Sequence, residues 1–176
     1  MAKKYEAVGS GIEEMATAQN YETTTVKDVL GQSRTRATKG GKVITVTPLA
    51  INRDFEFAKF VDLAIERQFE LSDLEKEFLF VKMYKKVGET EETAKPVAWI
   101  QKGVVVPTDW AMGNQELQAG VEVNMIKEPT FGTIDFDAIG EKFIAETSIP
   151  TSDMIFYEEG DASRSDFVMY YIYETA

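Results

Sequence analysis

The chain has 176 residues, with 30 acidic and 19 basic side chains, a formal net charge of −11, and neither histidine nor cysteine. The missing imidazole and thiol groups exclude Ser-His-Asp and Cys-His catalysis and zinc sites built from those ligands. The excess of acid argues against a protein that holds nucleic acid or docks on anionic membranes, since both need clustered lysine and arginine. We therefore expect no enzyme, with no catalytic residues, no cofactor and no metal.

The first fifty residues predict strands. Residues 5–15 form a short apolar-polar segment that Gly9-Ser10-Gly11 interrupts, and residues 21–26 are rich in β-branched side chains. Residues 34–49 predict a hairpin, because Gly40-Gly41 lies between two β-prone runs and can supply the positive φ angles of a tight turn.

Residues 53–69 predict the one helix. Their apolar side chains recur at intervals of three and four, which places them on a single stripe that packs against strands: Phe57, Phe60, Val61, Ala64 and Ile65. Asn52 is the expected N-cap, and the capping-box spacing of Ser72 and Glu75 predicts one further short turn.

Strands follow this helix. Residues 77–86 have apolar side chains on both faces, so we expect a strand that is covered on both sides. A second strand, residues 97–106, should end at Pro107, because proline cannot donate to a ladder. Residues 116–127 alternate strictly between apolar and polar, which predicts an antiparallel strand with one wet or partner-facing side. A short strand is expected over residues 131–136.

The last part of the chain differs in composition. We expect a brief helix or linker over residues 138–149, and strands over 154–158 and 167–173. The two strands form a terminal hairpin, join an intramolecular sandwich, or pack on another copy, because an edge strand with two apolar faces is sticky. The longest apolar run, 167–173, is far below the roughly 20 residues of a membrane helix.

The predicted fold is thus mainly β: an antiparallel β-sandwich or barrel with one flanking α-helix over residues 1–149. An acidic, aromatic C-terminal arm or hairpin follows over residues 150–176.

Several short motifs resemble chemical sites, and each has a structural explanation. Gly9-Ser10-Gly11 lacks the third glycine and the βαβ unit of a dinucleotide site, and Gly41-Lys42 lacks the upstream glycine and the following Ser or Thr of a P-loop. The paired glutamates Glu13-Glu14, Glu91-Glu92 and Glu158-Glu159 are adjacent in sequence, so on a strand they point to opposite faces. Asp135 and Asp137 lack the further ligands of a calcium loop.

Taken in order, several stretches resemble one family. They are residues 8–15 (VGSGIEEM), the predicted hairpin and helix, residues 77–86, residues 102–107 (KGVVVP), residues 112–114 (MGN) and residues 129–135 (PTFGTID). Over roughly residues 5–137 their order and spacing resemble the major tail proteins of long-tailed, non-contractile phages of Gram-positive bacteria. Residues 150–176 do not match this pattern.

The resemblance implies a virion protein that works by self-assembly. Six copies would form a ring whose inner sheets close into one β-barrel, and rings would stack through loops and terminal arms. The resulting tail tube carries DNA into the host as passing cargo. Expected partners are other copies and the tape measure, tail completion or terminator, and distal tail proteins. The protein would be found in the virion tail and, before assembly, in the host cytoplasm, with no membrane partner.

This interpretation assigns roles to particular residues. The long polar segment Asp28 to Lys42 is an expected ring-to-ring contact, and Glu122 and Asn124 are expected to face the lumen. An acidic wall would repel phosphate, so DNA could pass without being held. The individual candidates for contacts between rings are Lys3, Lys4, Arg34, Arg36, Lys39, Tyr170 and Tyr171.

Other functions remain open at this point. A monomeric small-molecule-binding β-barrel with the helix as a lid predicts an apolar cavity. A carboxylate-based hydrolase predicts two convergent, buried acids with raised pKa values. Another tube protein of the same fold, from a contractile tail or a secretion system, differs from the leading interpretation only in its setting.

Overall fold

A computed structural model describes residues 2–8, 12–27, 30–51, 54–87, 95–112, 117–135, 142–145, 154–156 and 167–175. Within these residues the fold is mainly antiparallel β with one α-helix, α1 (Glu56–Arg67), which confirms the predicted fold class. A 3-10 turn, Leu71–Leu74, occurs where the second capping signal predicts a short turn, although no side chain caps it.

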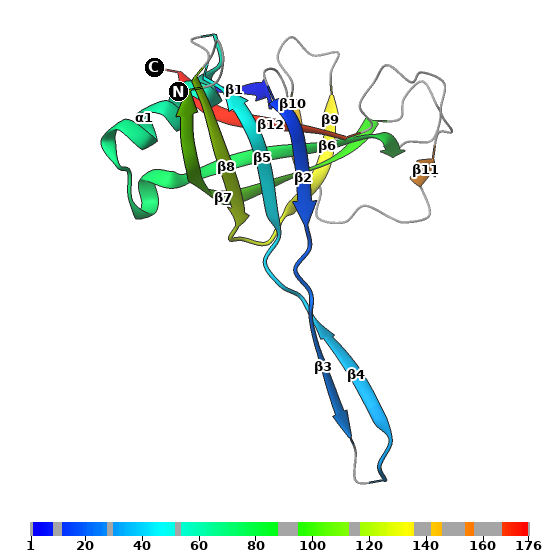
Figure 1. Ribbon diagram of the computed structural model, residues 1–176. Coiled ribbons are helices and arrows are strands. Elements are labelled where there is room, and N and C mark those ends of the chain that lie inside the picture. Colours follow the sequence, from blue (N-terminus) through cyan, green and yellow to red (C-terminus); the bar gives the residue numbers. More distant parts are fainter. Residues whose placement is uncertain are drawn as a thin grey trace.

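One sheet forms the body of the molecule, with strand order β1-β12-β6-β7-β8-β5-β2 (Figure 1). Its strands are β1 (Ala2–Ala7), β2 (Ile12–Ala18), β5 (Val43–Ala50), β6 (Glu75–Val87), β7 (Lys95–Met112), β8 (Leu117–Met125) and β12 (Phe167–Thr175). β9 (Thr130–Asp135) pairs with β7 and with β10 (Lys142–Ala145), and β11 (Met154–Phe156) pairs with β6. A separate two-stranded sheet joins β3 (Glu22–Lys27) to β4 (Ser33–Thr38).

The main core lies on the inner side of the curved sheet, and α1 packs against part of it. The predicted helical stripe is confirmed: Phe57, Val61 and Ala64 are buried, and Phe60 and Ile65 pack against the same cluster. The Phe57 ring lies 6.1 Å from that of Phe78 on β6 and 5.3 Å from that of Tyr171 on β12, measured between centroids. Burying these large aromatic side chains is the dominant attraction between helix and sheet.

The strand β6 is buried on both faces, as its sequence predicts. Phe78 and Phe80 belong to the main core, while Leu79 and Val81 join a second cluster on the opposite face with Ile134. Because successive side chains of a strand point to opposite faces, the unbroken apolar run of β6 fits a strand covered on both sides.

The start of α1 is set by a residue distant in sequence. Glu6 on β1 accepts two hydrogen bonds, from the Glu56 N–H at 2.9 Å and the Phe57 N–H at 2.8 Å. These N–H groups have no partner inside the helix, and a carboxylate at this end also interacts favourably with the helix dipole. The helix is shorter than the predicted 53–69, and the predicted cap, Asn52, lies outside the described residues.

The predicted hairpin over residues 34–49 is wrong in its pairing. β4 and β5 are both strands, but β4 pairs with β3 and β5 pairs with β2. The chain therefore runs out through β2 and β3 and returns through β4 and β5 as one long ribbon (Figure 1). A Cβ atom at Gly40 would collide with the backbone carbonyl of Asn20, so this glycine permits a close crossing of two chain segments rather than a turn.

Two further local predictions are wrong. β7 continues past Pro107 to Met112, with a register shift against β8 between Pro107 and Asp109. Proline is tolerated there because a bulge does not need its missing N–H. In residues 138–149, where a helix or linker was expected, the described part is strand β10.

The C-terminal strand is not an arm. β12 lies between β1 and β6 inside the sheet, and β11 also pairs with β6, so these two strands do not form a hairpin with each other. Met169, Tyr171 and Ile172 are buried within the same chain. The apolar side chains of this strand are thus buried by other parts of the same chain. The two ends of the chain lie side by side, with Ala2 opposite Thr175.

Candidate functional site

The β3–β4 hairpin projects away from the body (Figure 1). Every described side chain from Tyr21 to Lys27 and from Leu30 to Lys39 is exposed, including three apolar or aromatic ones: Tyr21 (62% exposed), Val26 (53%) and Leu30 (80%). Strands of six residues extend about 20 Å at the usual rise. A two-stranded ribbon is marginally stable alone in water, so this hairpin has the properties of a segment that docks on something else.

The net charge of the described hairpin is positive, whereas that of the whole chain is negative. Among its described residues, Lys27, Arg34 and Arg36 outnumber the single acid Glu22. Arg34 and Arg36 are two residues apart and therefore share a face, opposite Val26 and Thr24 of β3. The hairpin thus presents arginines beside an exposed valine on one face.

Among the described strands of the body, β1, β2, β10 and β11 each pair with a single neighbour, and the two longest of these edges are β1 and β2. β1 and β2 end the strand order, so within the described residues each pairs with one neighbour. Lys4 is exposed on β1, and charge of this kind discourages strand pairing. Along β2, Ala16, Thr17 and Ala18 are exposed and uncharged, which leaves that edge open to another strand.

The alternation of β8 is as predicted. Val121 and Val123 are fully buried, while Glu122 and Asn124 are half-buried on the opposite face of the strand. Glu122 lies between Val106 of β7 and Thr45 of β5. Glu122 and Asn124 therefore belong to the face of the β7–β8–β5 sheet that points away from the main core.

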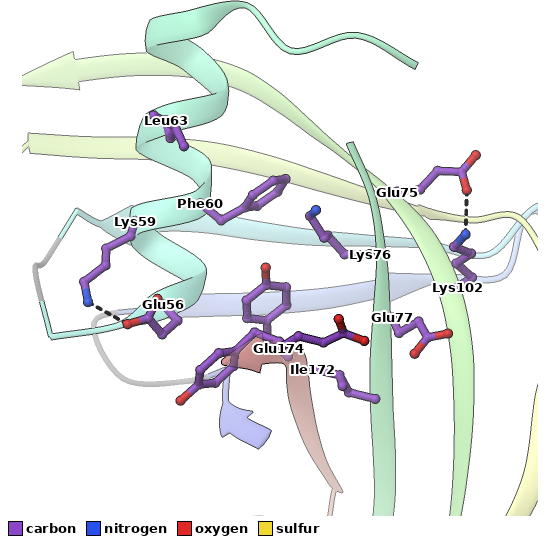
Figure 2. A pocket seen from close by; sticks show the side chains of 12 residues that line it. Glu56, Lys59, Phe60, Leu63, Glu75, Lys76, Glu77, Lys102, Ile172 and Glu174 are labelled. Carbon is purple, nitrogen blue, oxygen red and sulfur yellow. Dashed lines mark hydrogen bonds and ion pairs between the residues drawn. The ribbon is translucent and has the colours of Figure 1, made fainter. Parts of the chain in front are cut away.

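A groove of about 630 Å³ lies between α1, the start of β6, the middle of β7 and the end of β12 (Figure 2). Aromatic side chains line its middle: the Phe60 and Tyr171 rings are 6.2 Å apart and nearly parallel, and Tyr171 and Tyr173 stack at 6.0 Å. The Nζ atom of Lys76 lies 4.6 Å from the centroid of the Phe60 ring. Flat rings with a nearby cation form a platform that suits stacking or apolar contact.

Ion pairs line both sides of this groove. Lys59 donates to Glu56 at 2.6 Å on the helix side, and Lys102 lies 2.8 Å from Glu75 on the strand side (Figure 2). The hydrogen bond from Lys102 lowers the pKa of the Glu75 carboxyl, and the same bond raises the pKa of Lys102. The Lys102–Glu75 pair is therefore charged near neutral pH.

Burial raises the pKa of Tyr171 to about 12, and the carboxylates of Glu56 and Glu6 add to this rise. Its hydroxyl is neutral at physiological pH. Acids exceed bases by one among the lining residues, since Glu56, Glu75, Glu77 and Glu174 face Lys59, Lys76 and Lys102. The groove combines an aromatic platform with charged rims, as recognition surfaces do.

Lys42, considered above as a P-loop residue, has a different environment. Its Nζ lies 4.7 Å from the centroid of the Phe80 ring and 5.1 Å from that of Trp99. Burial, and to a smaller extent the charge of Lys82, lowers the pKa of Lys42. The ring faces attract its ammonium group, so Lys42 closes one end of the aromatic core.

The predicted contact residues fall into two groups. Lys3 and Lys4 lie on β1, Arg34 and Arg36 are exposed on β4, and Lys39 is exposed with an ion pair to Glu128 at 3.0 Å. Tyr171 is buried against Phe57 and Phe78, with its remaining surface in the groove, and its role in contacts between rings stays a prediction. Tyr170 is half-buried and packs against the second core cluster, and its contact role likewise stays a prediction.

The candidate catalytic pairs contribute no described side chains, because Glu91-Glu92 and Glu158-Glu159 are outside the described residues and only the backbone of Glu13-Glu14 is placed. In the described part of the chain, no group of three or more acidic side chains is arranged to hold a metal ion. Among the helices of that part, none has the length and apolar character needed to cross a bilayer.

No protein-family model and no curated protein matches this chain. Among solved structures, one similar chain comes from the cryo-EM structure of the anti-feeding prophage (AFP) baseplate, 6-fold symmetrised. The match has 12% sequence identity and a TM-score of 0.30, and it covers 73% of this chain and 89% of that chain. A likeness at this level establishes neither a shared fold nor a shared function.

Proposed function

We propose that this chain is a structural protein of a phage tail, which assembles with copies of itself into stacked rings that form a tail tube. The observation that carries the proposal is the projecting hairpin: a fully exposed, basic, partly apolar ribbon on an otherwise acidic molecule. The resemblance of residues 5–137 to major tail proteins supports the same conclusion, as does the match between the exposed hairpin and the segment expected to join rings.

Ring formation in this proposal uses strand edges. The uncharged stretch Ala16–Ala18 at the outer edge of β2 can accept a strand from a neighbouring copy, and joining edges around a closed ring removes the aggregation hazard of an open sheet. The ring would contain six copies, as the family resemblance implies. Its partners would be the tape measure, completion or terminator, and distal tail proteins, in the virion tail.

The proposal assigns no catalytic role and treats DNA as cargo. Glu122 and Asn124 would lie in the lumen, where acidic and neutral side chains do not hold phosphate. A monomeric ligand-binding barrel, the main alternative, would need a hollow apolar interior. Among the described residues the interior is instead packed with side chains such as Phe57, Phe78 and Val121.

The direct test replaces residues 22–38 by a two-residue Asn-Gly turn. The hairpin pairs only with itself among the described strands, so the shortened chain should fold like the parent by circular dichroism and denaturant unfolding. Light scattering and negative-stain imaging should show rings or tubes for the parent and no stacked tubes for the variant. Equal assembly by both proteins, or a parent that stays monomeric at high concentration, would contradict the proposal.

The lumen assignment has its own test. Tubes of Glu122→Lys/Asn124→Lys should assemble but retain DNA in a gel-shift or filter assay, because the added ammonium groups bind phosphate. Glu66→Lys, a reversal on the exposed side of α1, is the matched control and should not cause retention. If tubes with lysine at residues 122 and 124 release DNA as readily as the parent, these residues do not face the lumen.

A further inference from the structure

Two lysines converge on the aromatic end of the core. The rings of Phe80 and Trp99 stack with their centroids 5.2 Å apart, and the Nζ atom of Lys42 lies within 5.1 Å of both centroids. The Nζ atom of Lys82, on β6, lies 5.5 Å from the centroid of the same Trp99 ring. Both lysine side chains are half-buried, so each is partly accessible to solvent. Two like charges therefore share one apolar surface.

The backbone around Lys42 is fixed on both sides. The carbonyl of Lys42 accepts a hydrogen bond from the Met125 N–H at 2.9 Å, and the next residue begins β5, which pairs with β8. Two residues earlier, Gly40 is in close contact with the backbone of Asn20. The stem of the Lys42 side chain thus starts from a defined point and lies along the rings, which places its amine at one position.

The charges near this amine favour its neutral form. Glu128, which follows β8, pairs with Lys39 at 3.0 Å, and no described carboxylate forms an ion pair with Lys42. Burial, and then the charge of Lys82, lowers the pKa of Lys42. By contrast, a hydrogen bond to a carboxylate raises the pKa of Lys59. The attraction of the ring faces for an ammonium group opposes part of the lowering at Lys42 and holds the side chain in place.

We infer that Lys42 is an acylation site, whose ε-amine accepts an acyl group from an acyl phosphate. The neutral amine attacks the carbonyl carbon and forms an amide C–N bond. The bond between that carbon and the phosphate oxygen breaks, and the oxygen keeps the electron pair. The amine proton passes to the departing phosphate, so the products are an acyl-lysine and inorganic phosphate. The reaction needs a single folded chain, so its failure would leave the proposed tail function untouched.

The second lysine determines the class of acyl donor. An acyl phosphate has an anionic phosphate beside its carbonyl, and negative charge grows on the bridging oxygen as the phosphate leaves. The ammonium group of Lys82 stabilises that charge, whereas it offers nothing to a neutral donor. Two lysines close together also attract a small anion to this part of an otherwise acidic molecule. Acylation then removes one of the two like charges and leaves an uncharged amide against the rings.

The test compares two lysines on one peptide. The whole protein is incubated with acetyl phosphate and then unfolded, and the remaining amines are labelled with deuterated acetic anhydride. Digestion after glutamate releases residues 23–56, which contain both Lys39 and Lys42, for mass spectrometry. We expect Lys42 to react at least about threefold faster than Lys39 in the folded protein, because a lowered pKa increases the fraction of neutral amine. In urea the two rates should become equal. Equal rates in the folded protein, or a preference that persists in urea, would overturn the inference.

Substitutions at residue 82 test the choice of donor. Lys82→Gln should slow the reaction of Lys42 with acetyl phosphate at least about threefold, and Lys82→Arg, which keeps the charge, should react like the parent. With acetic anhydride, a neutral donor, Lys82→Gln should have a smaller effect. Lys76→Gln removes a different lysine that lies against a ring, that of Phe60, and should leave the rate at Lys42 unchanged. Circular dichroism checks that each variant is folded. If Lys82→Gln slows both donors equally, or slows neither, the assignment of an acyl phosphate is wrong.

Discussion

The body and the hairpin of this molecule are stabilised in opposite ways. In the body, side chains such as Phe78, Phe80 and Val121 are fully buried, and α1 is capped by a carboxylate from another strand. In the hairpin, all described side chains are exposed, and one side-chain contact across it is the 3.1 Å Thr25–Thr35 hydroxyl pair. The body therefore has its own buried core, whereas the hairpin has few contacts that would keep it ordered without a partner.

The largest expected effect tests this contrast directly. Phe78→Ala removes a fully buried ring from the core and should lower the free energy of unfolding by about 3–5 kcal/mol. The matched change in the hairpin, Val26→Ala, should alter it by no more than about 0.5 kcal/mol. Urea denaturation of both variants gives the comparison, and a destabilisation by Val26→Ala that approached that of Phe78→Ala would show that the hairpin packs on its own body.

The next effect depends on pH. Tyrosine ionises near pH 10 in an unfolded chain, and the pKa of Tyr171 is about 12 in the fold. The folded state thus binds the Tyr171 proton more tightly than the unfolded state does. The stabilisation of the fold that results is complete below pH 10. It is lost as the pH rises toward 12, which lowers the free energy of unfolding by about 2–3 kcal/mol. In Tyr171→Phe this part of the loss of stability at alkaline pH should be absent. Tyr21→Phe, at the exposed base of the hairpin, should leave the loss unchanged when both are followed by denaturant titration.

A smaller effect concerns the joint between β1 and α1. Glu6→Ala removes both hydrogen bonds to the first N–H groups of the helix and should cost about 1–2 kcal/mol. Glu22→Ala, which removes an exposed acid of the hairpin, is the control and should be neutral within error. Thermal unfolding followed at 222 nm suffices, and equal melting temperatures for Glu6→Ala and the parent would mean that this cap does not stabilise the fold.

The smallest expected effect is a gain. Gln68 ends α1 with a φ of 51°, a left-handed conformation that glycine adopts more readily. Gln68→Gly should stabilise the body by up to about 1 kcal/mol. Assembly, which we attribute to the hairpin and the strand edges, should not change. A variant that was more stable but assembled poorly would place residue 68 near a contact between copies.

The sequence predicts individual helices and strands better than it predicts which segments they pair with. The alternation of β8 and the helical stripe from Phe57 to Ile65 are local periodicities, and both are confirmed. The hairpin turn predicted at Gly40-Gly41 was wrong because a glycine pair fits a turn and a close chain crossing equally well. The crossing involves Asn20, which is distant in sequence. Likewise, nothing near residue 56 in sequence indicates that Glu6 provides the cap.

The groove was not predicted for a related physical reason. Its lining residues come from α1, β6, β7 and β12, and no pattern within any one of these segments indicates that they meet. The Lys59–Glu56 pair is recognisable from its spacing, but the Lys102–Glu75 pair joins strands that only the fold brings together. Of the residues assigned to contacts from sequence, the hairpin arginines are exposed as such a role requires, while Tyr171 is part of the core.

The carboxylate of Glu6 also sets an order of events during synthesis. The strand that holds it, β1, pairs with β12, the last described strand to leave the ribosome. Until translation reaches Thr175, β1 lacks that neighbour, and the helix lacks a firmly placed cap. Pairing of the first strand with the last is slow to form because it closes nearly the whole chain into a loop. Completion of the body, and with it of the groove lined by β12, is thereby postponed until β12 has been made.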